Sequence, residues 1–111
     1  MIPLGNYELA NMIISEGALE ILQCLQKQGK ASFKDLRNLK NNRTGKTFSP
    51  NTVSARLKEL RKYEAITATI MDSSGRNKIV YELTESGKKA LQLADKFEGE
   101  LKQILKKRIK S

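Results

Sequence analysis

KTFSPNTVSARLKELRKYEAITATIMDSSGRNKIVYELTESGKKAL, residues 46–91, is the stretch that decides the fold. A helix is predicted to begin at Ser49-Pro50. At an N-cap, the Ser hydroxyl accepts a hydrogen bond from a backbone N–H that has no partner within the helix. Pro suits the first helical position because the backbone N–H that it lacks would have no helical partner there. Two segments of alternating residues and a second helical pattern follow. This order predicts a helix with a β-hairpin wing beside it.

The helix predicted over residues 49–62 has two different faces. Val53, Leu57 and Leu60 recur at helical spacing and are expected to face a core. Small, polar and cationic residues of the kinds that bind bases and phosphates lie on the outer face and its flanks. We predict DNA contacts for Ser49, Asn51, Thr52, Ser54, Ala55, Arg56, Lys58 and Lys62. An ordinary solvated helix would present a similar face, so this pattern alone leaves both interpretations open.

The next segment predicts an antiparallel hairpin. Residues 66–72 and 78–84 alternate with a period of two, and the turn cluster 73–77 contains Gly75. Its cationic tip suits contact with a phosphate backbone or a minor groove. The predicted contacts in this wing are Ser74, Arg76, Asn77 and Lys78. A basic tip taken alone is more often a solvated turn, and the helix beside it favours DNA contact.

The chain has 111 residues, which suits one domain, and a formal net charge of +9. Such a charge favours a polyanionic partner, with nucleic acid first and an acidic membrane surface second. The stretch from Leu36 to Lys58 contains several cations and no acid. Within it, Arg43 and Lys46 of the loop 40–48 are predicted to contact phosphates, although a solvated loop is the alternative.

The residue types also exclude some chemistry. There is no His, Cys24 is the only cysteine, and the carboxylates are scattered among cations. Neither a zinc site nor a Cys/His pair can be assembled conventionally, so we expect no enzyme, metal or cofactor. Cys24 is expected to pack in a core rather than act as a redox switch. We see no membrane span or targeting segment in the sequence and expect a cytoplasmic protein.

The first half of the chain predicts an N-terminal arm or short helix over residues 1–14 and then two helices. The first begins with Ser15 as N-cap and ends at Gly29. The second begins with a capping box formed by Ser32 and Asp35. Their apolar positions are Ala18, Ile21, Leu22, Leu25, Phe33, Leu36 and Leu39.

A long helix over residues 85–109 is predicted after the hairpin, with a heptad-like apolar stripe. A helix of this length cannot bury the whole stripe on so small a domain, so we expect a second subunit to cover it. Folding back onto its own domain is the alternative. The predicted dimer interface consists of Leu9, Ile13, Ala90, Ala94, Phe97, Leu101, Ile104 and Leu105. The expected units are thus an arm (1–14), a winged-helix domain (15–84) and a dimerisation helix (85–111).

The motifs Thr52-Val53-Ser54-x-Arg56-Leu57-Lys58-x-Leu60, Ile66 and Tyr81-x-Leu83-Thr84-x-x-Gly87-x-x-x-Leu91 resemble those of winged helix-turn-helix transcription regulators. The resemblance is to the MarR, PadR and HxlR kind, especially small archaeal or viral members, and covers residues 15–91. It implies a homodimeric, sequence-specific regulator of double-stranded DNA, with recognition helix 49–62 and wing tip 73–78. The chain departs from the pattern at Glu64-Ala65, where such proteins commonly have Gly, and in its longer loop 40–48.

The expected fold is therefore mostly α with a small antiparallel β-hairpin. Two other functions fit the same sequence: a winged-helix protein-interaction module and a sequence-blind architectural DNA-binding protein. Preference for a specific site over bulk DNA would separate them from a regulator. The chain between the predicted hairpin and the long helix has no polar cluster that indicates an effector pocket, and the sequence leaves open whether a small molecule controls the protein.

Overall fold

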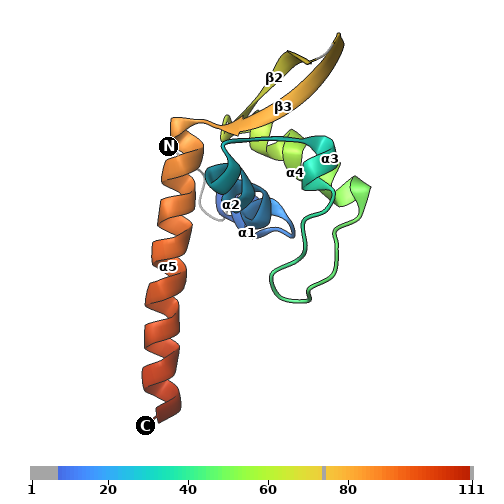
Figure 1. Ribbon diagram of the computed structural model, residues 1–111. Helices are drawn as coiled ribbons and strands as arrows, with labels where there is room; N and C mark the ends of the chain where they lie inside the picture. The colour runs from blue at the N-terminus through green and yellow to red at the C-terminus, as the bar shows by residue number, and fades with distance from the viewer. Residues whose placement is uncertain (1–7, 74, 111) are drawn as a thin grey trace.

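The computed structural model describes residues 8–73 and 75–110, with side chains for 11–72 and 75–105. A helical globule carries a protruding hairpin at one end, and a long terminal helix runs down one side (Figure 1). The elements in order are α1 (Glu8–Ile14), α2 (Ala18–Gln28), β1 (Lys30–Ser32), α3 (Phe33–Leu36), α4 (Pro50–Lys62), β2 (Ile66–Ser73), β3 (Arg76–Leu83) and α5 (Glu85–Lys110). The expected mostly helical fold with a small antiparallel β-hairpin is confirmed.

Helix α4 begins as predicted. Ser49 has an extended backbone, and its hydroxyl accepts the Thr52 N–H at 3.1 Å, while Pro50 occupies the first helical position. Val53, Leu57 and Leu60 are buried in the core. The capping residues thus fix where the helix starts, and its apolar stripe fixes which face turns outward.

The sheet has three antiparallel strands in the order β1-β3-β2. The hairpin pairs Ile66 with Leu83, and its register continues to Ser73 opposite Arg76. The predicted hairpin is confirmed, with strands slightly longer than expected. Strand β1 is an addition that the sequence did not predict, because it has three residues and ends at the Ser that caps α3.

Two predictions in the N-terminal half need correction. Ser15 is not the N-cap of α2: its hydroxyl donates to the Met12 carbonyl, and the N-cap position is Gly17 with φ 94°. The turn between α1 and α2 requires a left-handed backbone conformation at this position, and Gly adopts it without a Cβ clash. Helix α3 ends at Leu36, so Leu39 lies outside it, although the capping box of Ser32 is present.

The core lies between α2, α4, the sheet and the start of α5. Its fully buried side chains include Ile21, Leu22, Leu25, Leu36 and Leu91. Cys24 is buried among them as predicted, and this burial raises the pKa of its thiol. A raised thiol pKa means less thiolate at neutral pH, which is the opposite of a reactive cysteine.

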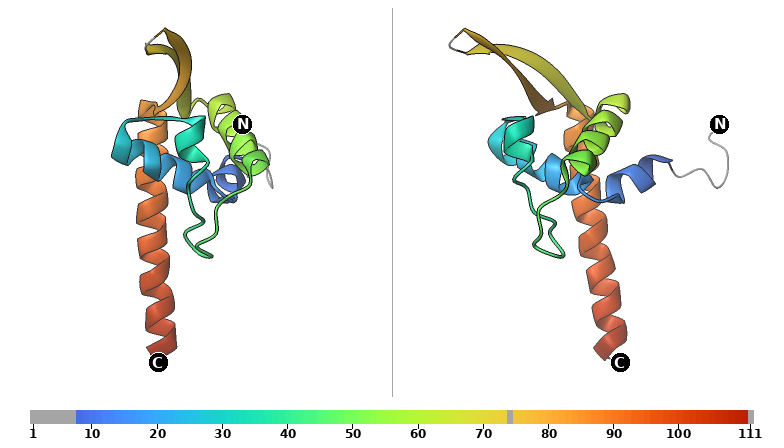
Figure 2. Two further views of the ribbon diagram at one scale, coloured as in Figure 1. Left: turned by 45° about the vertical axis from the view of Figure 1, so that its right-hand side comes forward. Right: turned by 90° about the vertical axis from the view of Figure 1, so that its right-hand side faces the viewer.

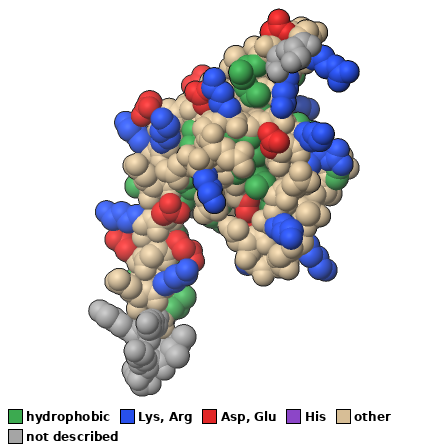
Figure 3. Space-filling view, viewed as in Figure 1, with side chains coloured by type: hydrophobic (Ala, Val, Ile, Leu, Met, Phe, Trp, Pro, Cys, Tyr) green, Lys and Arg blue, Asp and Glu red, His purple; other side chains and the backbone are tan. Residues whose placement is uncertain are grey.

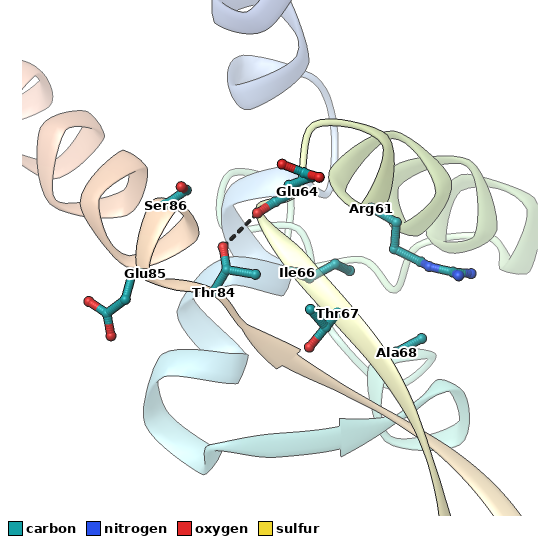
Figure 4. Close-up of a pocket in the computed structure, with 8 residues that line it drawn as sticks. All are labelled: Arg61, Glu64, Ile66, Thr67, Ala68, Thr84, Glu85 and Ser86. Carbon is teal, nitrogen blue, oxygen red and sulfur yellow. Dashed lines mark hydrogen bonds between the residues drawn. The ribbon is translucent and has the colours of Figure 1, made fainter.

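Hydrogen bonds join the turn between α4 and β2 to the start of α5, and Figure 4 draws the one between Thr84 and Glu64. The Thr84 hydroxyl donates to the Glu64 carbonyl at 2.6 Å and accepts the Gly87 N–H at 3.0 Å. The Thr84 N–H donates to the Ala65 carbonyl at 3.0 Å. The first turn of α5 therefore lies against the α4–β2 turn, which sets the direction in which the long helix leaves the globule.

Glu64 has a left-handed backbone, with φ 60°, in the turn after α4. This position is the departure from the resembled pattern noted in the sequence, and a non-glycine residue there costs about 1 kcal/mol. We expect Glu64→Gly to raise the free energy of unfolding by somewhat less than this, because Gly also gains entropy in the unfolded chain. Urea denaturation would measure the change. The control is Glu85→Gly in the first turn of α5, which should lower the stability of the protein. A less stable Glu64→Gly protein would contradict this account.

Helix α5 is the expected long terminal helix. At 1.5 Å per residue its 26 residues span about 39 Å. It continues far below the globule in both views of Figure 2. Leu91 is buried, whereas Leu93, Phe97, Ile104 and Leu105 are more than half exposed. In the described part of the chain, none of the helices combines the length and the hydropathy that crossing a membrane would require.

Candidate nucleic-acid interface

The outer face of α4 carries polar and cationic side chains. Asn51, Ser54, Lys58 and Lys62 are exposed, and Ala55 is half-buried. The cap and the buried stripe of α4 determine this arrangement, because residues opposite the core must face solvent. The helix is thus able to present amide, hydroxyl and ammonium groups to a partner.

The hairpin and the loop between α3 and α4 lie on either side of α4, above and below it in Figures 1 and 2. Lys and Arg side chains follow the same margin of the molecule, from the hairpin tip down to the loop (Figure 3). A few acidic side chains stand among them. The three elements together form an elongated, largely cationic surface centred on α4.

The loop is held in place by its own asparagines. Asn41 closes a turn through its backbone N–H to the Lys46 carbonyl at 2.8 Å, and its side chain accepts the Arg43 N–H at 2.8 Å. The Asn42 backbone N–H donates a hydrogen bond to a carboxylate oxygen of Glu20 in α2, at 3.0 Å. Phe48 then returns the chain to the core. Arg43 and Lys46 are therefore displayed by a hydrogen-bonded loop, and both side chains are exposed.

The hairpin tip carries cations and one acid. Arg76 lies opposite Ser73, and Lys78 lies opposite Met71. Asp72 lies opposite Asn77, and its carboxylate reduces the net positive charge of the tip. Arg76, Asn77 and Lys78 are all exposed. Ser74, also predicted to contact DNA, lies outside the described residues.

Lys78 also lies near the short helix α3. Hydrogen bonds from the Ser32 backbone N–H and hydroxyl are the main causes that lower the pKa of Asp35. The charges of Lys78 and Lys34 lower it further. The wing and the start of α3 therefore bring two cations, Lys78 and Lys34, near the same carboxylate.

Arg61 belongs to this surface, although it was not among the residues predicted to contact DNA. Its exposed side chain lines a cleft together with Ser54 and Lys58, on the side of α4 that faces the hairpin. The signal was present in the sequence, because Arg61 follows Ser54 and Lys58 at spacings of seven and three.

Some of the predicted contact residues are turned elsewhere. Arg56 is partly buried and forms an ion pair with Glu59, and it packs with Thr52 against Gly17 of the α1–α2 turn. The hydroxyl of Ser49 is occupied in capping α4. The structure therefore does not bring Arg56 to the outer face, because its position on the helix lies beside the stripe that packs on α1 and α2. The Lys62 ammonium lies 5.6 Å from the centre of the Tyr63 ring, at the end of α4.

Among the described residues, no group of three or more His, Cys, Asp or Glu side chains could hold a metal ion. The arrangement offers hydrogen bonds and positive charge, which are the means of binding nucleic acid.

No protein-family model matches the sequence, and no curated protein sequence matches it either. Solved structures do resemble the fold. Diamide-treated YodB from B. subtilis is 19% identical with a TM-score of 0.73, covering 93% of this chain and 95% of that one. The protein ytfH from Salmonella typhimurium, described as a putative transcriptional regulator, is 25% identical with a TM-score of 0.63. The match covers 91% of this chain and 88% of that one.

A PadR family transcription regulator from Clostridium difficile R20291 is 18% identical with a TM-score of 0.69, and the match covers 82% of this chain and 95% of that one. Each match spans most of both chains. The resemblance inferred from the sequence is thus confirmed for the fold: this chain is a winged helix-turn-helix protein of the architecture found in these regulators.

Proposed function

We propose that the protein is a transcription regulator that binds specific sites in double-stranded DNA as a homodimer in the cytoplasm. The observation that carries this proposal is the exposed polar face of α4 between two cationic projections, the hairpin and the loop. A helix fits the major groove of DNA, and flanking cations bind the phosphates on either side of it.

In this proposal the residues divide into two groups. Asn51 and Ser54 lie near the start of α4 and contact base edges, since Asn can bond adenine bidentately and Ser can bond several bases. Phosphates are bound by side chains of α4, the loop and the wing, namely Lys58, Arg61, Arg43, Lys46, Arg76 and Lys78. The first group determines which sequence is preferred, and the second supplies affinity that depends on salt.

The exposed apolar side chains of α5 support the dimer. Phe97, Ile104 and Leu105, all in the predicted interface, remain more than half exposed, and so does Leu93, which the sequence analysis did not name. Ala90, Ala94 and Leu101 are half-buried, as is Ile13, which packs on the core. The side chain of Leu9 lies outside those described. A second copy of α5 would remove this apolar surface from water.

Selection of bound sites from a random pool of duplex DNA tests the proposal. We expect one enriched motif with two symmetric halves about one helical turn apart, bound at least ~10³-fold more tightly than bulk DNA. Binding without enrichment would indicate an architectural protein, and no binding at low salt would indicate an interaction module. Either result would contradict the proposed function.

Charge placed in the exposed stripe of α5 should separate the subunits. We expect Phe97→Asp with Ile104→Asp to give a monomer in sedimentation experiments and to weaken binding to the symmetric site about 100-fold, because two half-sites are no longer bound together. The monomer should keep its stability, because both side chains are exposed within one chain. Gln92→Asp with Gln103→Asp adds the same charge to exposed positions of α5 and serves as the control. A variant that remains dimeric would rule out this interface.

A further inference from the structure

The side of the hairpin that faces α4 stays apolar beyond the core. Ile66 opposite Leu83 is buried, and Ala68 opposite Tyr81 is half-buried. Ile70 opposite Ile79 comes next on the same face, and these two side chains are 67% and 52% exposed. An apolar ridge thus continues from the core into the wing, where β-branched residues stabilise the strands but leave apolar surface in water.

A cleft of about 540 Å³ separates α4 from this side of the hairpin. Phe33 and Tyr81 contribute aromatic rings to its walls, while Lys58 and Arg61 line its α4 side. Both cations are exposed, and within the described part of the chain neither forms an ion pair. The cleft therefore combines an apolar wall with unneutralised positive charge.

We propose that this cleft binds the sugar–phosphate backbone of one DNA strand. Lys58 and Arg61 bind its phosphates, and the deoxyriboses pack on the ridge that ends in Ile79 and Ile70. A DNA strand has this combination of surfaces, with anionic oxygens on one side and the C–H groups of its sugars beside them. The proposal rests on the DNA binding proposed above and assigns a role to side chains that carry no charge.

The ridge should have a distinct signature in binding. Contacts with phosphates release counterions, so they make the affinity fall with salt concentration. Apolar contacts with sugars release none, and their contribution is nearly independent of salt. Loss of the ridge should therefore lower affinity by the same factor at every salt concentration.

The test replaces both residues with Thr, a β-branched residue that keeps the strand preference but adds a hydroxyl. For Ile70→Thr with Ile79→Thr we expect DNA affinity to fall about tenfold, with an unchanged slope of log affinity against log salt. Met71→Thr is the control, because Met71 is 40% exposed on the same strand but on the opposite face. That variant should bind within about twofold of the unchanged protein.

Other outcomes would overturn the proposal. Unchanged affinity of the double variant would show that the ridge does not contact DNA, and an equal loss in Met71→Thr would indicate general damage to the hairpin. A changed oligomeric state would assign the ridge to a contact between subunits. These failures differ from failure of the proposed function, in which the unchanged protein itself would not select a DNA site.

Discussion

Replacing Lys58, Arg61 and Lys78 together with Gln is expected to weaken DNA binding about 100-fold or more at physiological salt. Each lost phosphate contact also lowers the slope of log affinity against log salt by about 0.9, so the slope should fall by between two and three. The triple variant should keep the fold, because all three side chains are exposed. Fluorescence anisotropy with labelled duplex DNA over a range of salt concentrations would measure both quantities.

The control must have the same net charge. Lys27→Gln, Lys89→Gln and Lys96→Gln remove three exposed cations from α2 and α5, away from the proposed surface. Both triple variants lower the formal charge from +9 to +6. If binding depends on where the charge lies, the control should lose much less affinity than the first variant. Equal losses in the two proteins would mean that general charge attracts DNA and that the assigned surface is wrong.

Gly87→Ala is expected to lower the free energy of unfolding by about 2 kcal/mol or more. A Cβ at this position would lie far inside van der Waals contact of the Ala65 carbonyl oxygen and 3.0 Å from the carbonyl carbon. Ala normally stabilises a helix by about 1 kcal/mol relative to Gly, but displacement of packed backbone costs about 3 kcal/mol. The clash therefore outweighs the helix preference, and the net change in stability is negative. Thermal denaturation should show a midpoint lower by roughly 10 °C.

Gly99→Ala provides the matched control on the same helix. Apart from the backbone of its own helix and its two chain neighbours, no atom lies within 4 Å of a Cβ built at Gly99, so the gain in helix preference should appear without a clash. We expect this variant to be slightly more stable than the unchanged protein. If Gly87→Ala were equally stable, the close approach of α5 to the α4–β2 turn would not describe the protein in solution.

Local patterns were sufficient to predict α4 and the hairpin. Ser49-Pro50 fixed the start of α4, and alternation fixed which residues of the hairpin share a face. These signals succeed because capping and side-chain periodicity act over a few neighbouring residues. Prediction failed at Ser15 and at strand β1, because Gly17 fits against Thr52 and Arg56 of a distant helix and β1 exists only through its pairing with β3.

The candidate interface divides in the same way. The sequence by itself determined a mostly helical winged fold, a cationic character and an α4 with Asn51, Ser54 and Lys58 on its outer face. Only the tertiary structure decided that Arg56 packs on the α1–α2 turn and that Arg61 lines the cleft toward the hairpin. Helical spacing orders residues around an axis, but the elements that pack on each flank are distant in sequence, and their positions arise only when the core is formed.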